Sequence, residues 1–223
     1  MKILAFDTST ELCSVAIFLD GKIFSREILA GRRHSELLLP MINETLAESE
    51  LALTQLDGIA FGAGPGSFTG LRIACGVAQG LAFATNLPIT GISTLEAMAQ
   101  KLGQHKVIAA LDARMGEIYH AAYIKFADKW KIISAPTLCH PHHATLLSGD
   151  NWIGCGSGFD AYKEELSARY IGNILHIKQD IHPHAQEIAQ LAIPKFTDGS
   201  DTNPINAAPI YIRNKVALKE NER

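Results

Sequence analysis

Residues Gly62-Ala-Gly-Pro-Gly-Ser-Phe-Thr-Gly-Leu-Arg72 decide how this chain folds. They follow a strand-like run, Leu56–Phe61, and open a helix-like run, Thr69–Thr85. A glycine-rich turn between a strand and a helix start can bind an anion, because its backbone N–H groups point outward and the helix dipole favours negative charge. The strand, the turn and the helix together indicate an α/β fold.

The usual partners of a phosphate-binding turn are missing from this stretch. No Lys-Ser or Lys-Thr pair follows the glycines, so the stretch is not a Walker A loop. No carboxylate occurs between Asp57 and Glu96, so the ribose-binding acid of a dinucleotide fold is absent. A tight turn that needs φ > 0 explains the glycines equally well. The sequence leaves both interpretations open.

The chain repeats one pattern of strands and helices. A first set of strands is expected at Ile3–Asp7, Ser14–Leu19 and Lys22–Leu29, and a second set at Val107–Asp112, Glu117–Lys125 and Trp130–Ala135. A glycine-containing segment and a helix follow each set, the second helix being expected over Asp160–Tyr170. This duplication predicts two small α/β lobes, residues 1–104 and residues 105–223, with any ligand between them.

Composition excludes several classes of protein. The chain has 223 residues, 47% of them hydrophobic and 19% charged, with a net charge of -3. No apolar run reaches about 18 residues, so no membrane span is expected. The four cysteines have no C-x-x-C spacing, and the N-terminal apolar run is too short for a signal peptide. We therefore expect a cytoplasmic protein that does not bind nucleic acid by itself.

The first two long helices expected from the sequence are of different kinds. Ser35–Ser49 is amphipathic, whereas Thr69–Thr85 is apolar or small nearly all round and has Arg72 as its one charge. A helix of the second kind is either fully buried or covered by a partner. Small residues on Thr69–Thr85 would also let another helix approach closely. On these two helices the apolar or small residues at helical spacing include Leu38, Met41, Ile42, Thr45, Leu71, Ala74, Ala78 and Ala82.

Four motifs, taken in order, resemble one family. They are Met1-Lys-Ile-Leu-Ala-Phe-Asp-Thr-Ser-Thr10, the glycine stretch 62–72, Asp112-Ala-Arg-Met-Gly-Glu-Ile-Tyr119 and Pro209-Ile-Tyr-Ile-Arg-Asn214. Together they resemble the TsaB (YeaZ) family over nearly the whole chain. The resemblance implies the duplicated fold of actin, sugar kinases and heat-shock chaperone ATPases. It also implies a role in forming threonylcarbamoyladenosine at position 37 of tRNAs that read codons beginning with A.

The resemblance further implies partners rather than chemistry of its own. Members support the transferase TsaD, pairing through their first two helices, and join the ATPase TsaE in a ternary complex. The resemblance therefore implies an interface formed by Leu38, Met41, Ile42, Thr45, Leu71, Ala74, Ala78 and Ala82. Alone, the chain is expected to form a homodimer through the same surface, and to meet tRNA only indirectly. No cofactor is expected, and nucleotide only within the complex.

Two departures bear on catalysis. In TsaD the corresponding third helix carries His-x-x-x-His, and Thr94 and Met98 occupy those positions here, so neither a metal site nor acyl transfer is expected. In kinases of this fold the residues matching Asp7 and Thr8 hold Mg²⁺ and phosphate. With Gly62, Gly64 and Gly66 they form a candidate phosphate loop that is expected to be vestigial. The alternative is a weak ATPase or a peptidase-like enzyme, and the role of the cluster His140-Pro-His-His143 stays open.

Overall fold

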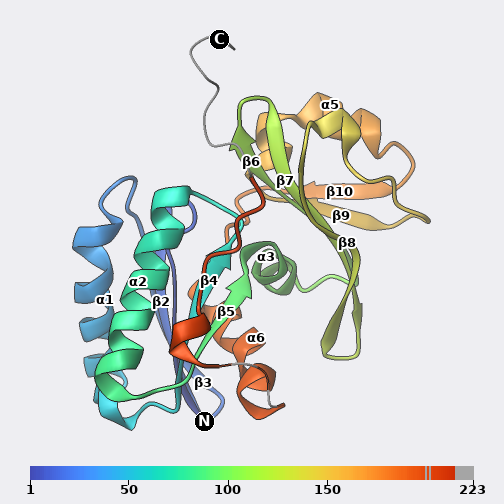
Figure 1. The fold of residues 1–223 in the computed structure, drawn as a ribbon. Coiled ribbons are helices and arrows are strands. Elements are labelled where there is room, and N and C mark those ends of the chain that lie inside the picture. The colour runs from blue at the N-terminus through green and yellow to red at the C-terminus, as the bar shows by residue number, and fades with distance from the viewer. Residues whose placement is uncertain (199, 201, 214–223) are drawn as a thin grey trace.

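The computed structural model describes residues 1–198, 200 and 202–213. The chain forms two α/β lobes, each built on a five-stranded sheet (Figure 1). The strand orders are β3-β2-β1-β4-β5 and β8-β7-β6-β9-β10, so the second sheet repeats the first. In each sheet three strands pair antiparallel as a meander, and two more join parallel to the first strand. The expected duplicated α/β fold is confirmed.

The first lobe follows the repeat expected from the sequence. Its strands are β1 (Lys2–Asp7), β2 (Leu12–Leu19), β3 (Lys22–Leu29), β4 (Gly58–Gly64) and β5 (Ile89–Ser93). Its helices are α1 (His34–Glu48), the short η1 (Leu53–Gln55), α2 (Phe68–Thr85) and α3 (Thr94–Leu102). Because alternate residues of β1 point to opposite sides of the sheet, both faces of this strand need a covering layer.

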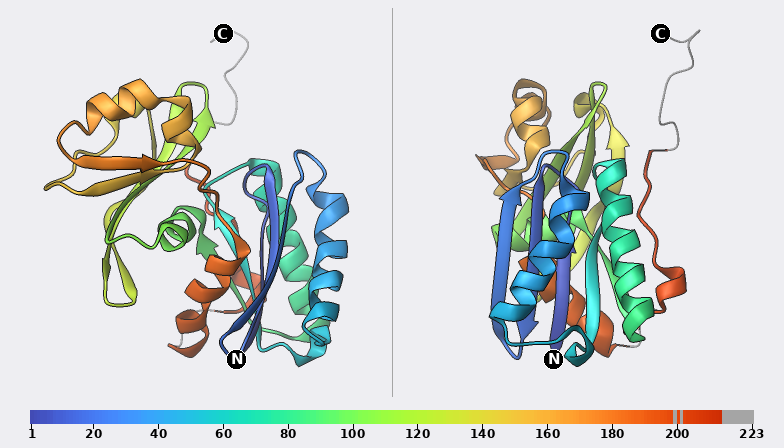
Figure 2. Two further views of the ribbon diagram at one scale, coloured as in Figure 1. Left: turned by 180° about the vertical axis from the view of Figure 1, so that it is seen from behind. Right: turned by 90° about the vertical axis from the view of Figure 1, so that its left-hand side faces the viewer.

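Different helices cover the two faces of the first sheet (Figures 1 and 2). Helices α1 and α2 pack on one face, against Leu4, Phe6 and neighbouring residues. Helix α6 (Ala185–Thr197) packs on the other face, against Ile3 and Ala5. The sequence assigned all of residues 105–223 to the second lobe, and the structure differs here. The chain returns to the first lobe because the second face of β1 would otherwise expose its apolar side chains.

The second lobe contains the remaining elements. Its strands are β6 (Lys106–Arg114), β7 (Glu117–Phe126), β8 (Lys129–Cys139), β9 (Trp152–Cys155) and β10 (Ile174–Lys178). Its helices are η2 (Pro141–His143), α4 (Ser157–Ala161) and α5 (Lys163–Arg169). The single helix expected over Asp160–Tyr170 is broken at Tyr162, which has φ -129°. The break lets the Tyr162 hydroxyl reach Asp112, to which it donates at 3.2 Å.

Helix α3 joins the lobes, and the C-terminal segment crosses between them again. Side chains of α3, among them Leu95 and Met98, are buried against the second sheet, while Ala97 packs with α6 on the first. After α6 the chain forms η3 (Pro204–Asn206) beside α2 and then runs to the second lobe (Figure 2). Among the described residues, no helix combines the length and apolar character needed to cross a bilayer.

The turn between β4 and α2 packs directly on the turn between β1 and β2. A Cβ atom at Gly70 would lie 1.8 Å from the carbonyl oxygen of Thr8, and one at Gly66 would lie 2.6 Å from that of Ser9. Cβ atoms do not approach backbone oxygens so closely, so only glycine fits at either position. These two glycines therefore set the distance between the loops and the place where α2 begins.

Asp7 ends β1 at this junction and is completely buried. Its Oδ1 accepts hydrogen bonds from the backbone N–H of Ser9 at 3.0 Å and from the Ser9 hydroxyl at 2.8 Å. Its Oδ2 has no hydrogen-bond partner among the described residues and faces Gly62, where a Cβ would come within 1.8 Å. Burial raises the pKa of Asp7 to about 6, because desolvation of the carboxylate outweighs the two hydrogen bonds from Ser9.

Two glycines of α2 should respond oppositely to the same substitution. Gly70→Ala should lower the free energy of unfolding by about 1–3 kcal/mol, because the new methyl group overlaps the Thr8 carbonyl. Gly80→Ala should raise it by about 0.5–1 kcal/mol, because a Cβ at Gly80 meets no atom within 4 Å and alanine favours the helix. Urea unfolding of both variants measures this, and equal effects would contradict the packing described.

Asp7→Asn should change how stability depends on pH. In the folded state Asp7 keeps its proton up to about pH 6, whereas in the unfolded chain it loses the proton near pH 3.9. The protonated Asp7 therefore contributes fully to the free energy of unfolding below about pH 4, and this contribution is lost as the pH rises through about 6. Asparagine imitates the neutral form. The variant should therefore be more stable than the parent by about 2–3 kcal/mol at pH 8 and nearly equal to it at pH 4. Urea unfolding at both pH values tests this, and a difference that does not vary with pH would refute it.

Candidate functional site

The candidate phosphate loop is assembled, but its donors bond to the protein itself. The structure places Asp7 against Gly62, and the two residues after Asp7, Thr8 and Ser9, against Gly70 and Gly66. Gly64 instead lies against Leu71 and the carbonyl of Ile210. The backbone N–H of Ser67 donates to the carbonyl of Ser9 at 2.7 Å, and the Thr8 hydroxyl donates to the carbonyl of Gly70 at 2.7 Å. These contacts occupy groups that a phosphate would need at the start of α2.

A cleft of about 840 Å³ lies between the lobes next to this loop. The first lobe contributes Ser9, Thr10, Gly66 and Ser67 to its wall, and the second lobe contributes the β6–β7 turn and α4. Three arginines and three carboxylates line it, namely Arg32, Arg114, Arg213, Glu11, Asp112 and Asp160. This balance of charge offers no strong field for a polyanion.

The positions that hold histidines in TsaD are part of the core here. Thr94 and Met98 are fully buried, and the Thr94 hydroxyl donates to the carbonyl of Pro65. Met98 lies against Gly156, where a Cβ would come within 2.2 Å of its Cε. Within residues 1–198, 200 and 202–213, no group of three or more His, Cys, Asp or Glu side chains is arranged to hold a metal.

The histidine cluster is also accounted for by local contacts. The rings of His140, His142 and His143 have centroids 4.1–6.2 Å apart. Nδ1 of His140 lies 2.9 Å from the carbonyl oxygen of Gly116, which ties this segment to the β6–β7 turn.

The interface side chains expected from the sequence face the wrong way. All eight are buried within the first lobe, and Ala78 has no exposed surface. Helices α1 and α2 turn these residues onto β1, β2 and β4, because the sheet must be covered before any partner binds. The residue-level prediction is therefore wrong: Leu38, Met41, Ile42, Thr45, Leu71, Ala74, Ala78 and Ala82 are core residues.

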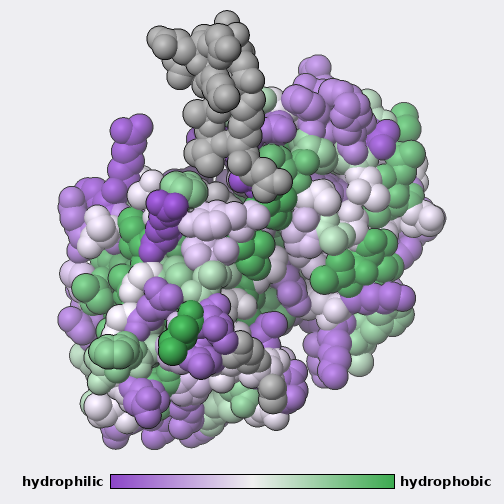
Figure 3. Space-filling view, viewed as in Figure 1, coloured by the Kyte–Doolittle hydropathy of each residue, from purple (hydrophilic) through white to green (hydrophobic). Residues whose placement is uncertain are grey.

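The opposite side of α2 is exposed, and it is also apolar. At helical spacing it carries Ile73, Gly76, Val77, Gly80, Phe83 and Ala84, which we call the α2 face. Ile73 and Val77 are half-buried, the other four are exposed, and Phe83 is 89% exposed. In the space-filling view the surface over α2 shows green and near-white residues interspersed with purple ones (Figure 3). Its six residues, spread over about three turns of the helix, are uncharged, and the exposed Arg72 lies one turn before Gly76 at the N-terminal edge of the face.

Gly76 and Gly80 have no role in the packing of this chain. A Cβ at either position would meet no atom within 4 Å. Each glycine costs about 0.5–1 kcal/mol of helix stability relative to alanine. Two small residues four apart let the backbone of a second helix approach closely. The α2 face thus has the shape of a surface that another helix covers.

The C-terminal segment forms the border of the α2 face. Ala207 accepts a hydrogen bond from Gln79 Nε2 at 2.9 Å, and the Tyr211 hydroxyl accepts one from Arg72 Nε at 3.0 Å. The Arg72 guanidinium lies 3.8 Å from the centroid of the Phe68 ring. This border supplies the aromatic and arginine side chains that are enriched in binding hot spots. Asn214, the last residue of the fourth motif, lies outside the described residues.

Sequence reasoning missed these functional candidates although signals were present. The spacing Gly76-x-x-x-Gly80 marks the exposed side of α2, since neither glycine begins or ends the helix. The position of Tyr211 and Arg213 had no local signal, because their contacts lie about 100 or more residues away along the chain.

Comparison with known proteins identifies the family. A family model described as "TsaD: tRNA N6-adenosine threonylcarbamoyltransferase" matches residues 27–217. The tRNA threonylcarbamoyladenosine biosynthesis protein TsaB of Escherichia coli is 39% identical, over 99% of this chain and 98% of its own length. The protein of the same name from Haemophilus influenzae is also 39% identical, over 99% and 97%.

Solved structures agree with the sequence relatives. YeaZ from Pseudomonas aeruginosa superposes with a TM-score of 0.87 at 35% identity, covering 94% of this chain and 99% of its own. A second P. aeruginosa structure, described as an uncharacterized protein similar to peptidase YeaZ, gives 0.88 at 35% identity, over 95% and 99%. With the two-lobed fold, these matches show that the chain belongs to the TsaB (YeaZ) family, which is related to the TsaD transferases.

Proposed function

We propose that this chain is a non-catalytic subunit in the formation of threonylcarbamoyladenosine at position 37 of tRNA. In this proposal it binds a TsaD-type transferase through the α2 face and works in the cytoplasm. The names of its relatives support the pathway, and the geometry of α2 supports the proposed mode of action.

The observation that carries this proposal is the α2 face. Its exposed glycines weaken the helix without serving the fold, and Phe83 exposes most of its ring to water. Burial of such a surface against a second helix removes apolar area from water at about 25 cal/mol per Å². A mostly apolar helix face with Arg72 at its edge suits a stable protein partner better than a small ligand.

Features of the glycine loop and of α3 argue against an enzymatic activity of this chain alone. Thr94 and Met98 replace the metal-binding histidines of the transferase and are buried in the core. The donors of the glycine loop bond to Ser9 and Gly70 rather than facing an empty pocket. The alternative considered from the sequence, a weak ATPase or a peptidase-like enzyme, would need metal ligands at positions 94 and 98 and free donors in the glycine loop. We propose that any nucleotide binds only within the assembled complex.

Two further partners follow from this proposal. An exposed face of this kind is complementary to a copy of itself, so the isolated chain would form an isologous homodimer through α2. That homodimer and the TsaD heterodimer would compete for one surface. TsaE would then join the heterodimer rather than the free chain, and tRNA would contact the transferase first.

Ala84→Glu should abolish binding to TsaD without unfolding the chain. Ala84 is exposed on the last turn of α2, beside Phe83 at the C-terminal end of the α2 face, so glutamate is tolerated in the free protein but becomes an unpaired buried charge in the complex. The expected loss is about 3 kcal/mol, or roughly 100-fold in affinity. Calorimetric titration with purified TsaD measures it, and circular dichroism checks the fold.

Ala168→Glu is the matched control. Ala168 is an exposed alanine on α5 of the other lobe, so the same change there should leave TsaD affinity unaltered. If Ala84→Glu binds TsaD as well as Ala168→Glu does, the α2 face is not the docking surface. In a reconstituted modification assay, the first variant should be inactive and the second should be active.

The double variant Gly76→Ala, Gly80→Ala should separate stability from binding. Both substitutions should stabilise the free chain, because alanine favours the helix by about 0.5–1 kcal/mol at each site. Both should weaken association with TsaD, because the added methyl groups hold the second helix away. Thermal unfolding and calorimetric titration give the two quantities. An affinity that is unchanged or higher would contradict close helix approach at these glycines.

A further inference from the structure

The segment of residues 207–213, which we call the strap, bridges the two lobes at a second place. It leaves η3, runs beside α2 and ends at the β6–β7 turn of the second lobe (Figures 1 and 2). Residues 210–213 form part of the wall of the interlobe cleft. The strap therefore lies where it can control how far the cleft opens.

Several independent contacts fasten the strap to the first lobe. The backbone N–H of Ile210 donates to the carbonyl of Ala63 at 2.7 Å, at the end of β4. Tyr211 accepts a hydrogen bond from Arg72, and its ring lies 5.4 Å from that of Phe68. With the bond from Gln79 to the carbonyl of residue 207, these contacts involve both backbone and side chains. Loss of one side chain would leave this end attached.

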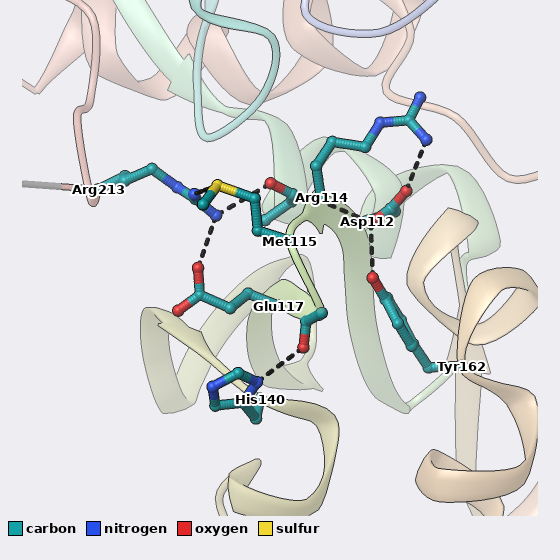
Figure 4. Close-up of polar contacts among 9 residues, drawn as sticks. Asp112, Arg114, Met115, Glu117, His140, Tyr162 and Arg213 are labelled. Atoms are coloured by element: carbon teal, nitrogen blue, oxygen red, sulfur yellow. Dashed lines mark hydrogen bonds and ion pairs between the residues drawn. The ribbon is translucent and has the colours of Figure 1, made fainter. Parts of the chain in front are cut away.

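Among the described residues, the hydrogen bonds that join the strap to the second lobe all come from one side chain, that of Arg213. Its Nη2 donates to Glu117 Oε2 at 2.7 Å and to the carbonyl oxygen of Ala113 at 3.0 Å (Figure 4). Its Nη1 lies 3.1 Å from the Met115 sulfur. The Arg213 and Glu117 side chains are only 15% and 26% exposed, so the ion pair is partly shielded from water and salt.

The turn that receives Arg213 is held in an unusual conformation. Arg114, Met115 and Gly116 all have positive φ, at 63°, 58° and 74°. Non-glycine residues seldom adopt this region, so such turns persist where their surroundings fix them. Asp112 supplies that support, because its Oδ1 accepts from the Arg114 backbone N–H at 2.8 Å and from the Tyr162 hydroxyl (Figure 4). The turn thereby presents the Ala113 carbonyl and the Glu117 carboxylate to one guanidinium.

We propose that the strap is a clasp that holds the interlobe cleft at its present opening, and that the Arg213–Glu117 contact is its release point. Helix α3 packs between the sheets and provides a natural pivot, while the strap crosses at a separate position. Lobes of one chain move relative to each other unless their contacts prevent it. Breaking the one-residue anchor should therefore let the lobes swing about α3 while the strap stays on α2. This inference needs no partner protein and is independent of the proposed function.

Spin labels on the two lobes can test the clasp in the full chain. Ser35→Cys on α1 and Ala168→Cys on α5 provide exposed sites, and Cys139→Ser removes the one native cysteine that is not buried. Electron–electron double resonance should give one narrow distance distribution for this labelled parent. Adding Arg213→Gln, or Glu117→Gln, should shift the distribution to longer distances and broaden it.

The matched control is Arg26→Gln. Arg26 forms an ion pair with Glu48 at 2.9 Å, but both residues belong to the first lobe, so this variant should keep the parent distribution. Amide exchange at Ile210 should stay slow in the Arg213 variant, because the α2 end of the strap remains attached. Parent-like distances in both Arg213→Gln and Glu117→Gln would overturn the clasp. Fast exchange at Ile210 in these variants would overturn Arg213 as the release point.

Discussion

The contact between the β1–β2 turn and the glycine loop is the constraint on which the rest of the molecule depends. Gly70 lies against the Thr8 carbonyl and Gly66 against the Ser9 carbonyl, so the two turns meet at backbone distance. This contact fixes where α2 starts and which side of it meets the sheet. It also engages donors at the start of α2 internally, which agrees with the proposal that the helix acts through its surface rather than through its end.

Once α2 is placed, its glycines divide into two physical classes. Gly70 is required by the fold, because any side chain there overlaps backbone. Gly76 and Gly80 face open space and weaken the helix, so the fold gives no reason for them. Glycines that lower the stability of the free chain are explained if a second helix packs closely against them in a complex. The free energy of that packing would then exceed the helix stability that the glycines cost. The strap borders this surface and links it to the second lobe through Arg72, Tyr211 and Arg213.

Much of the fold could be predicted from the sequence, because the signals were local. Strand and helix periodicity gave most elements within a few residues, and the repeat gave the duplicated sheets. The return of α6 to the first sheet had no such signal, because it depends on which face of β1 remained uncovered. The break at Tyr162 likewise depends on a partner, Asp112, that is 50 residues away.

The proposed docking surface shows where pattern alone is insufficient. Since α2 is apolar or small nearly all round, its sequence does not say which side faces the core. The small residues Ala74, Ala78 and Ala82 suggested a strip for a partner, yet they are the residues that bring α2 close to its own sheet. Only the three-dimensional arrangement separates that inner strip from the outer one.

Hydroxyl-radical footprinting in the presence of TsaD tests the central claim most directly. Phe83 is 89% exposed on the α2 face, and Ile171 is 84% exposed on the second lobe, so both should be oxidised readily in the free chain at low concentration. When the complex forms, as judged by size-exclusion chromatography, oxidation of Phe83 should fall sharply while that of Ile171 stays the same. A complex in which Phe83 is oxidised as in the free chain would contradict the claim that α2 carries the partner.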